Sequence, residues 1–417
     1  MTDTLADPRT AIRSRYLART AGSRERFERA ARSIPGGSTR TTTFSPPYPP
    51  FIDHASGAYE WDVDGNRYLD LLGNYTSLIL GHAHPAVVEA VRRQLERGSA
   101  FAAPTELEVE LAEELRRRLP SLERVRFTNS GTEATMFAIR LARAVTGRPL
   151  VARFDRSYHG THDGVVLPAA GVPDAIRGLT IDLPWGDSDA VAQALAGREA
   201  QVAAIIVEPV QGAGGLRPAT AGFLQALRAL ATRHGIVLVF DEIICFRIGP
   251  HGAQGAFGVE PDLTTLGKIV GGGHPLAAFG GRADLMDRFD ARRPDALPHG
   301  GTFNGNPVAA AAGLATLRTL TPDVYARLDA LGARLEDGMR GRLAATGVPF
   351  DLVRVASLFQ LRLGVGEPAD LFLGLLAGGV HVAPRGMGAL STPVSEADVD
   401  GFVALAGDVA AELAALA

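Results

Sequence analysis

Short apolar and β-branched runs alternate with stretches of helical pattern from about residue 120 onward. The runs are RVRFTN, LVARFD, GLTIDLP, VAAIIVEPV, IVLVFDEII, LTTLGK and LAAFGGR. This alternation predicts an α/β domain with a mainly parallel, seven-stranded sheet that is buried on both faces. Polar residues that follow the runs should then lie at the strand ends, where the active sites of such folds are found.

The two ends of the chain have a different pattern. Residues 59–70, YEWDVDGNRYLD, predict a hairpin that turns at Asp64-Gly65. The last hundred residues predict helices around the strands SLFQLRL and VHVAPRG, and the arginine-rich N-terminus, which contains acids from Asp3 onward, predicts a solvated helix rather than a transit peptide. We expect three segments: 1–62 as part of a small domain and of the active-site wall, 63–306 as the large cofactor-binding domain, and 307–417 as a smaller α+β domain.

Composition narrows the function to small-molecule chemistry. The 417 residues are 46% hydrophobic and carry a net charge of −4, with arginines and acids interspersed, so nothing favours nucleic acid or an anionic membrane as a partner. No stretch approaches the length of a membrane span. The single cysteine, Cys245, excludes an internal disulfide framework and a cysteine metal cluster, and a reducing cytoplasm fits this usage.

One lysine stands out in DLTTLGKIVGGGHP. Lys268 is the only lysine of the chain, and the other 41 of the 42 Lys and Arg residues are arginine. A lysine amine can lose its proton and attack a carbonyl to form a Schiff base, whereas arginine stays protonated. The strand character before Lys268 and the three glycines after it, Gly271–Gly273, favour a reactive lysine at a strand end over a chance survivor on a solvated loop.

The stretch RFTNSGTEATMFAIRLARAVTG combines a strand, a small polar turn and a helix that should stop at Gly147. Ser130, Gly131 and Thr132 occupy the N-terminus of this helix, where unpaired N–H groups, two hydroxyls and a glycine can bind an anion. An ordinary helix cap is the alternative. The pattern is neither a P-loop nor a dinucleotide fingerprint, so a single phosphate suits it better than ATP or NAD.

The run IVLVFDEII ends in Asp241 and Glu242, and at least one of these carboxylates should lie against the core with a cationic partner. If the cofactor is pyridoxal phosphate, a carboxylate beside the ring nitrogen keeps that nitrogen protonated, so that the ring can act as an electron sink. A helix cap or a metal site are the alternatives. We expect no metal, because no histidine lies close by in sequence.

Six ordered motifs resemble those of the class III pyridoxal-phosphate aminotransferases, a family that includes glutamate-1-semialdehyde aminomutase and β-phenylalanine aminotransferase. From about residue 35 to the C-terminus the chain contains, in the family's order, NSGTEA, SYHG, VEPVQGAGG, FDEI, LTTLGKIVGGG and GGTFNGNP. The resemblance implies an α/β fold of the fold type I pyridoxal-phosphate transferases, with a large domain, a small domain and a homodimer whose active sites are shared across the interface.

The resemblance also implies roles for individual residues. Lys268 would form the Schiff base, and Asp241 would hold the pyridine nitrogen. The remaining cofactor-binding residues would be Ser130, Gly131 and Thr132 at the phosphate, Thr302 reaching the phosphate from the neighbouring subunit, Tyr158 stacked on the ring, Ile243 on its opposite face, Gln211 at the ring hydroxyl and Glu208 as an organiser behind them. His159 and Cys245 are interpreted as structural residues.

The substrates are expected to be an amino acid and a keto acid, each with a carboxylate that arginine can hold. Arg40, in the loop after IPGGST, and Arg385, in VHVAPRG, are the candidates, with Tyr75 as a further substrate contact. Either arginine could instead be a surface residue. The resemblance to β-amino-acid aminotransferases favours the two arginines as carboxylate ligands.

Three functions therefore stand. The main hypothesis is a transaminase that moves an amino group from a β- or ω-amino acid to 2-oxoglutarate or pyruvate. The alternative is an intramolecular aminomutase of the glutamate-1-semialdehyde type. A binding protein that has lost its chemistry is disfavoured because Lys268, Asp241 and Tyr158 are all present. DEIICFR departs from the commoner DEVMTGFR, so substrate size stays open.

Overall fold

The computed structural model describes residues 8–166 and 170–415, which form two compact units. One unit joins Met1–His84 to Ala326–Ala417, and the other is Pro85–Tyr325. The first seven residues of the expected N-terminal helix lie outside the described part. The units divide after His84 and Tyr325, whereas the sequence predicts boundaries after residues 62 and 306.

Pairing explains where the units divide. Strand β3 (Arg67–Asp70) pairs in parallel with β15 (Val380–His381), which ties residues beyond 62 to the C-terminal part of the chain. Helix α12 (Pro307–Thr319) packs on α4 (Pro85–Leu95) and α5 (Glu106–Arg118), so residues beyond 306 belong with the middle of the chain.

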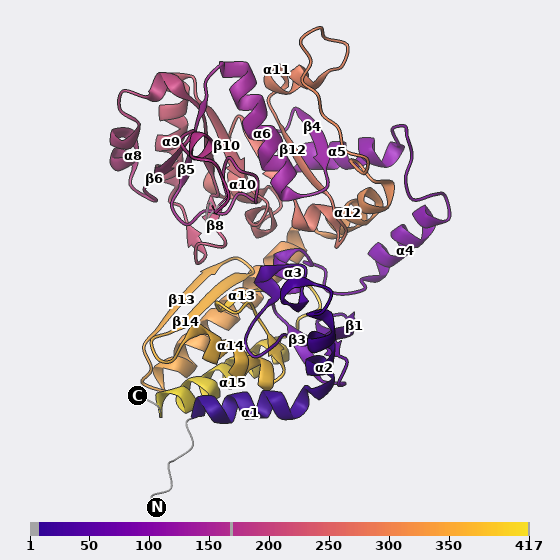
Figure 1. Ribbon diagram of the computed structural model, residues 1–417, viewed down its shortest axis with the longest axis vertical. Coiled ribbons are helices and arrows are strands. Elements are labelled where there is room, and N and C mark those ends of the chain that lie inside the picture. Colours follow the sequence, from indigo (N-terminus) through magenta and orange to yellow (C-terminus); the bar gives the residue numbers. More distant parts are fainter. Residues whose placement is uncertain (1–7, 167–169, 416–417) are drawn as a thin grey trace, which may run out of the picture. The chain divides into compact units, whose positions relative to one another are not determined.

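The unit Pro85–Tyr325 contains the predicted seven-stranded sheet (Figure 1). Its order is β4-β12-β11-β10-β7-β5-β6. The strands are β4 (Arg124–Thr128), β5 (Leu150–Phe154), β6 (Thr180–Leu183), β7 (Val202–Val207), β10 (Val237–Asp241), β11 (Leu263–Leu266) and β12 (Ala277–Gly281). Only β12 runs antiparallel to its neighbours, so the prediction of a mainly parallel sheet is confirmed.

Both faces of this sheet are buried. Val237 and Val239 of β10 pack in one apolar cluster with α6 (Gly131–Thr146), and Leu238 and Phe240 pack in a second cluster with α8 (Ser188–Leu195) and α9 (Ala221–His234). Burial on both faces is why these strands appear in the sequence as uninterrupted apolar runs rather than as alternating patterns.

The remaining elements of this unit are short. They include α7 (Asp174–Arg177), α10 (Gly252–Phe257), α11 (Ala283–Met286) and the small hairpin of β8 (Val210–Gln211) and β9 (Arg217–Pro218). Helix α6 ends at Gly147, whose φ of 68° is left-handed, so the predicted stop is confirmed.

The other unit contains two small sheets. In the first, β1 (Ile52–Ser56), β2 (Tyr59–Asp62) and β3 precede β15; in the second, β14 (Leu358–Leu363) lies between β13 (Phe350–Val355) and β16 (Met387–Ala389). The β2–β3 hairpin confirms the turn predicted at Asp64-Gly65. The helices are α1 (Pro8–Arg19), α2 (Ala21–Ala30), the turn α3 (Gly73–Thr76), most of α13 (Pro322–Ala344), α14 (Pro368–Ala377) and α15 (Glu396–Ala414).

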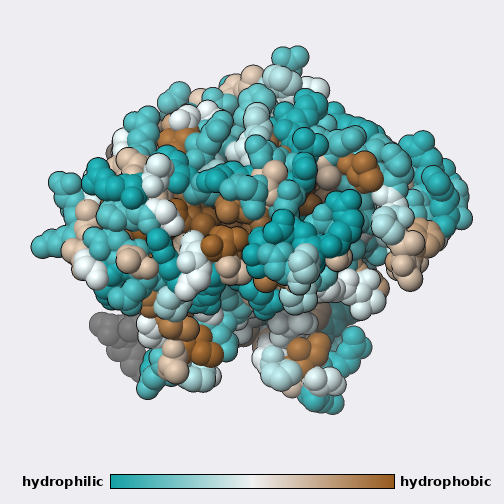
Figure 2. Space-filling model, turned by 90° about the horizontal axis from the view of Figure 1, so that it is seen from above, coloured by the Kyte–Doolittle hydropathy of each residue, from teal (hydrophilic) through white to brown (hydrophobic). Residues whose placement is uncertain are grey.

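The N-terminal helix is less solvated than the sequence predicts. Helix α1 packs against α14, and its Ile12 and Tyr16 are each 1% exposed. Among the described residues, no helix has the length and apolar content needed to cross a membrane. Hydrophilic side chains cover most of the face seen in Figure 2, and apolar ones gather in smaller patches.

Candidate active site

The expected cofactor-binding residues of the Pro85–Tyr325 unit, called the large unit from here on, follow the carboxyl ends of parallel strands in one sheet. Ser130–Thr132 follow β4, Tyr158 follows β5, Glu208 and Gln211 follow β7, Asp241 ends β10 and Lys268 follows β11. Because these strands are parallel, their carboxyl ends lie along the same edge of the sheet. The topology therefore gathers residues that are up to 138 positions apart in the sequence, from Ser130 to Lys268.

The turn between β4 and α6 has the features of an anion site. Ser130 is the N-cap of α6, and its hydroxyl accepts a hydrogen bond from the Glu133 N–H at 3.2 Å. A Cβ added to Gly131 would lie 2.6 Å from Cδ1 of Ile243, so a larger residue there would displace the end of the Ile243 side chain. The Thr132 hydroxyl accepts from the Thr161 N–H at 3.2 Å. The helix N-terminus supplies the unpaired N–H groups that favour a phosphate.

Asp241 is the carboxylate of the Asp-Glu pair that has a potential cationic partner. It is 2% exposed, and its Oδ2 lies 2.7 Å from Nδ1 of buried His159. Its Oδ1 accepts from the Ile243 N–H at 3.2 Å and the Thr265 hydroxyl at 3.1 Å. These contacts fix the orientation of the carboxylate.

Glu242 points to a different environment. Its carboxylate accepts hydrogen bonds from the Ala253 N–H at 2.6 Å and from the Gln254 N–H at 3.1 Å. Burial raises the pKa of Glu242 to about 7, although these hydrogen bonds oppose the shift. Glu242 therefore holds the start of α10, whereas Asp241 remains the candidate for the cofactor nitrogen.

Glu208 organises the backbone around Tyr158. Its carboxylate accepts from the Tyr158 N–H at 3.0 Å and the Gly212 N–H at 3.2 Å. Burial is the main reason that the pKa of Glu208 rises to about 7. The side chain of Tyr158 is itself half-exposed, as a ring that stacks on a ligand would be.

Gln211 presents an acceptor that the protein leaves unused. Its Nε2 donates to the Asp155 carbonyl at 2.7 Å and to the Ser157 hydroxyl at 2.8 Å. Its Oε1 is buried and has no hydrogen-bond partner among the described residues. A buried amide oxygen without a donor is unfavourable, so a ligand hydroxyl would fit it.

Lys268 begins a 3₁₀ turn, Lys268–Gly271, directly after β11. Its φ of 53° lies in the left-handed region, which is uncommon for a residue other than glycine. A Cβ on Gly272 would lie 2.4 Å from the Ala312 carbonyl, so the glycines after Lys268 allow α12 to approach. This lysine, the phosphate turn, the Asp241 carboxylate and the unpaired acceptor oxygen of Gln211 are together the groups that pyridoxal phosphate needs.

Two of the three expected substrate contacts meet in the other unit. Arg40 Nη1 donates to Asn74 Oδ1 at 2.9 Å, and its guanidinium lies 5.7 Å from the centre of the Tyr75 ring. Arg40 and Tyr75 both line a cavity of about 200 Å³. Arg385 is exposed and is not among the described residues that line this cavity, although its neighbour Pro384 is.

The same cavity contains paired acids and histidines. Glu60, Asp70 and His381 place potential metal-ligand atoms within 4.8 Å of one another. However, His381 Nδ1 is hydrogen-bonded to Glu60, and His82 Nε2 lies 2.7 Å from Asp70 Oδ2. These contacts are those of two histidine–carboxylate pairs.

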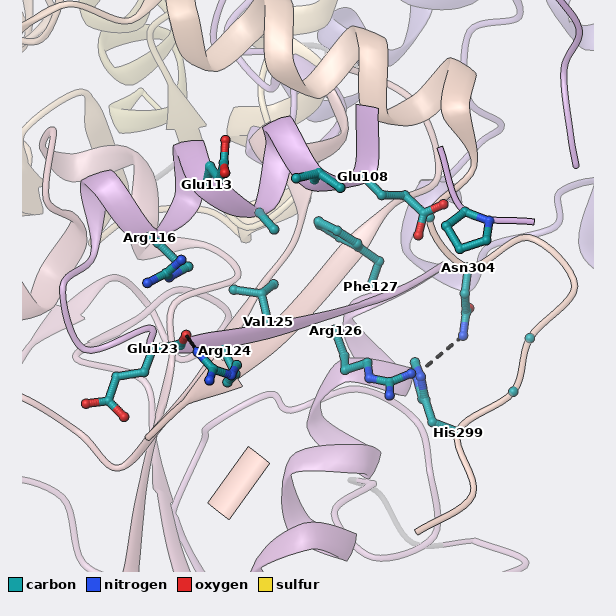
Figure 3. A pocket seen from close by; sticks show the side chains of 16 residues that line it. Glu108, Glu113, Arg116, Glu123, Arg124, Val125, Arg126, Phe127, His299 and Asn304 are labelled. Carbon is teal, nitrogen blue, oxygen red and sulfur yellow. Dashed lines mark hydrogen bonds between the residues drawn. The ribbon is translucent and has the colours of Figure 1, made fainter. Parts of the chain in front are cut away.

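A larger cavity of about 600 Å³ lies elsewhere, between α5, β4 and the loop that contains Thr302 (Figure 3). Arg126 and His299 point toward each other there, and Asn304 lies 3.4 Å from His299. None of the expected site residues is among the described residues that line it. Thr302 is exposed, as a residue that acts in a neighbouring subunit would be.

Sequence reasoning missed two residues that hold the site together. Thr265 was visible only as part of an apolar run, although its position beside Asp241 follows once the register of β10 and β11 is known. Asn129 donates to Asn304 Oδ1 at 2.9 Å and so links the phosphate turn to the loop of Thr302. His159 was interpreted as structural, and its contact with Asp241 defines that role.

Known proteins resemble nearly the whole chain. The family model described as aminotransferase class-III matches residues 43–175 and 186–383. A glutamate-1-semialdehyde 2,1-aminomutase of Bordetella avium (strain 197N) is 46% identical over 391 residues, which cover 86% of this chain and 91% of that protein.

Solved structures agree with this match. An omega-transaminase from Sphaerobacter thermophilus has a TM-score of 0.90 and 41% identity, with 94% of this chain and 98% of that chain covered. A beta-phenylalanine aminotransferase from Variovorax paradoxus has a TM-score of 0.88 and 36% identity, with 96% of each chain covered.

The fold defines a pyridoxal-phosphate-dependent enzyme of fold type I, in which Lys268 follows one strand of the large sheet and Asp241 ends the neighbouring strand. The chain belongs to the class III aminotransferases. Its cofactor is pyridoxal 5'-phosphate, so the cofactor and fold expected from the sequence are confirmed.

Proposed function

We propose that the enzyme transfers the amino group of a substrate whose carboxylate is held by Arg40. The observation that carries this proposal is the environment of the guanidinium. In the described part of the chain its hydrogen-bond partner is the neutral side chain of Asn74, and no acid forms an ion pair with it. A guanidinium that is oriented but not neutralised can receive a substrate carboxylate in a bidentate contact.

We also propose roles for residues of the large unit, and their geometry supports these roles. Bound pyridoxal phosphate supplies an electron sink for the substrate carbon that loses its proton. Asp241, oriented by His159 and Thr265, would hold a proton at the ring nitrogen. Nζ of Lys268 would bind the cofactor and move protons at the substrate carbon, and Gln211 Oε1 would accept from the ring hydroxyl.

The comparisons support intramolecular amino transfer of the glutamate-1-semialdehyde type better than transfer between two substrates. The curated relative with 46% identity over most of both chains carries that name. The reaction needs one carboxylate ligand, which Arg40 provides, and no second substrate.

Transfer between two substrates is the second candidate. The similar solved structures include an omega-transaminase and a beta-phenylalanine aminotransferase. Arg385 favours it as well, because a second arginine could hold the carboxylate of 2-oxoglutarate or pyruvate.

Single-turnover spectra distinguish the two candidates. An aminomutase should isomerise glutamate-1-semialdehyde without an added keto acid, and an added acceptor should not raise its rate. A transaminase should instead be converted to its pyridoxamine form by a β- or ω-amino acid, and Arg385→Ala should slow the return reaction with 2-oxoglutarate. Absence of both reactions in an enzyme that has bound its cofactor would refute both candidates.

The assembly that we propose is a homodimer. Large apolar side chains of the Pro85–Tyr325 unit are exposed on α4, α5 and the nearby loops: Val88, Leu95, Phe101, Val109 and Phe303. Exposed apolar groups of this size support a protein–protein interface. Phe303 is adjacent to Thr302, so the same loop could contribute to the interface and to the neighbouring subunit's phosphate site.

A further inference from the structure

We propose that Asn74 is a specificity-determining residue, which orients Arg40 while leaving the positive charge of Arg40 available for a substrate carboxylate. This inference rests on the proposed role of Arg40 and adds to it the reason that the charge stays available. The deciding property is that the partner of Arg40 is a neutral amide and not a carboxylate.

The backbone holds Asn74 in a fixed but unusual conformation. Gly73, Asn74, Tyr75 and Thr76 have φ values of 53°, 48°, 55° and 75°, all left-handed. Successive left-handed residues other than glycine are unfavourable and persist only when surrounding contacts enforce them. Asparagine tolerates this region better than most residues, so position 74 suits it on backbone grounds alone.

Asp70 provides the enforcing contacts. Its Oδ1 accepts from the N–H groups of Leu72 and Gly73, both at 2.8 Å, and its Oδ2 is paired with His82. The turn therefore starts from a buried carboxylate. The rigid turn then presents Asn74 Oδ1 to Arg40 and places the Tyr75 ring beside the guanidinium.

The charges around the cavity strengthen this interpretation. The two acids that line it, Glu60 and Asp70, are each paired with a histidine, His381 and His82. Arg40 is thus the cation of the cavity that lacks an acid partner among the described residues. An aspartate at position 74 would occupy the same place as Asn74 and form an ion pair with Arg40 within the protein.

Asn74→Asp tests the proposal, because it changes charge with little change of shape. We expect KM for the carboxylated substrate to rise about tenfold or more, since a charge-assisted hydrogen bond within the protein competes with the substrate. The value of kcat should change less than about twofold. The substrates measured are glutamate-1-semialdehyde and β-phenylalanine. The matched control is Gln201→Glu, which adds the same charge at an exposed position outside the cavity.

A double-mutant cycle with Arg40→Ala separates the possible outcomes. If Asn74 acts through Arg40, Asn74→Asp should have no further effect on KM when Arg40 is absent. The inference alone is overturned if Arg40→Ala raises KM but Asn74→Asp does not, or if Asn74→Asp acts equally in both backgrounds. If Arg40→Ala leaves KM unchanged, the proposed function fails and this inference fails with it.

A second variant covers the case in which Asn74→Asp does not fold, as judged by circular dichroism and the bound-cofactor spectrum. Asn74→Ala removes the acceptor without adding charge. KM should then rise by a few fold at constant kcat, and the rise should again be absent in the Arg40→Ala background. A purely structural role would lower kcat or cofactor occupancy in both backgrounds, and this result would overturn the proposal.

Discussion

At the scale of single residues, Lys268 combines chemical and conformational constraints. Its φ lies in the left-handed region, and Gly272 in the same turn permits close contact with α12. Strained backbone of this kind is found at active sites because the fold can hold a reactive side chain in one direction. The lysine is also unique in the chain, so a cofactor label on a lysine side chain can lie only at this position.

Reduction with borohydride should attach the cofactor covalently to a single peptide, the one that contains Lys268. Lys268→Arg should abolish turnover, because a guanidinium cannot replace the amine as a nucleophile at neutral pH. Peptide mass spectrometry checks the label, and steady-state assays check turnover. A label on another residue, or an active arginine variant, would contradict the assignment.

Asp241 is the second residue whose chemistry can be isolated. Asp241→Asn keeps the shape but removes the charge that faces His159, so the cofactor should still bind while proton abstraction slows. The expected loss is about 3–5 kcal/mol in the barrier, on the scale of a broken buried ion pair. Stopped-flow absorbance of the half-reaction measures it. Thr265→Val is a milder comparison, because it removes one hydrogen bond to Asp241 and leaves the charge in place.

At the scale of elements, local patterns predicted the large unit better than the small one. The strands of the large sheet have apolar residues on both faces, so β10 and β11 could be found as runs, and Asp241 and Lys268 could be placed at strand ends. The turn at Gly73–Thr76 could not be found in this way. Its conformation depends on Asp70 and His82, and β3, which ends in Asp70, is paired with β15 more than three hundred residues later in the chain.

The pairing of Asp70 with His82 predicts a pH dependence of stability. Burial lowers the pKa of His82, but the hydrogen bond and charge of Asp70 outweigh it, and the net shift is upward. Burial also opposes ionisation of Asp70, yet the His82 hydrogen bond and the charge of His381 leave its pKa lowered. The contribution of protonated His82 to the free energy of unfolding is therefore complete below about pH 6.5, and it disappears as pH rises through the raised pKa of His82. The contribution of ionised Asp70 to the free energy of unfolding is present above about pH 4, and it disappears as pH falls through the lowered pKa of Asp70.

His82→Gln isolates this contribution, since it removes the titrating ring but keeps a donor. The difference in unfolding free energy between wild type and variant should be largest near pH 5–6, about 1.5–3 kcal/mol for a charged hydrogen bond, and should shrink at alkaline pH. Urea unfolding at several pH values measures it. The His381–Glu60 pair remains in both proteins, and it also interacts electrostatically with Asp70 and His82. A difference that grows with pH would contradict the assignment.

At the scale of the whole molecule, the loop of Thr302 bears on how many chains contribute to one active site. Thr302 lies in an exposed loop, next to Phe303, which is 59% exposed, and Asn304 of the same loop bonds to Asn129 in the phosphate turn of its own chain. A loop that touches its own phosphate turn and also exposes an aromatic ring is suited to a dimer in which two such loops meet around a two-fold axis. The sequence predicted a dimer with a shared active site only through the family resemblance, because nothing in a single chain's pattern specifies a partner.

Mixing two impaired variants tests the shared site directly. Lys268→Ala lacks the reactive amine, and Thr302→Ala should bind the cofactor phosphate more weakly, by about 0.5–1.5 kcal/mol for one hydrogen bond. If Thr302 acts across the interface, a mixed dimer has one site with Lys268 from one chain and Thr302 from the other, and both defects fall together in the second site. At low cofactor concentration the mixture should therefore be more active than the sum of the two homodimers. If Thr302 serves its own chain, no intact site can form, and the activity of the mixture should equal that sum. Phe303→Ser provides the control, because a weakened dimer should abolish the gain on mixing and should appear as a smaller species in sedimentation velocity.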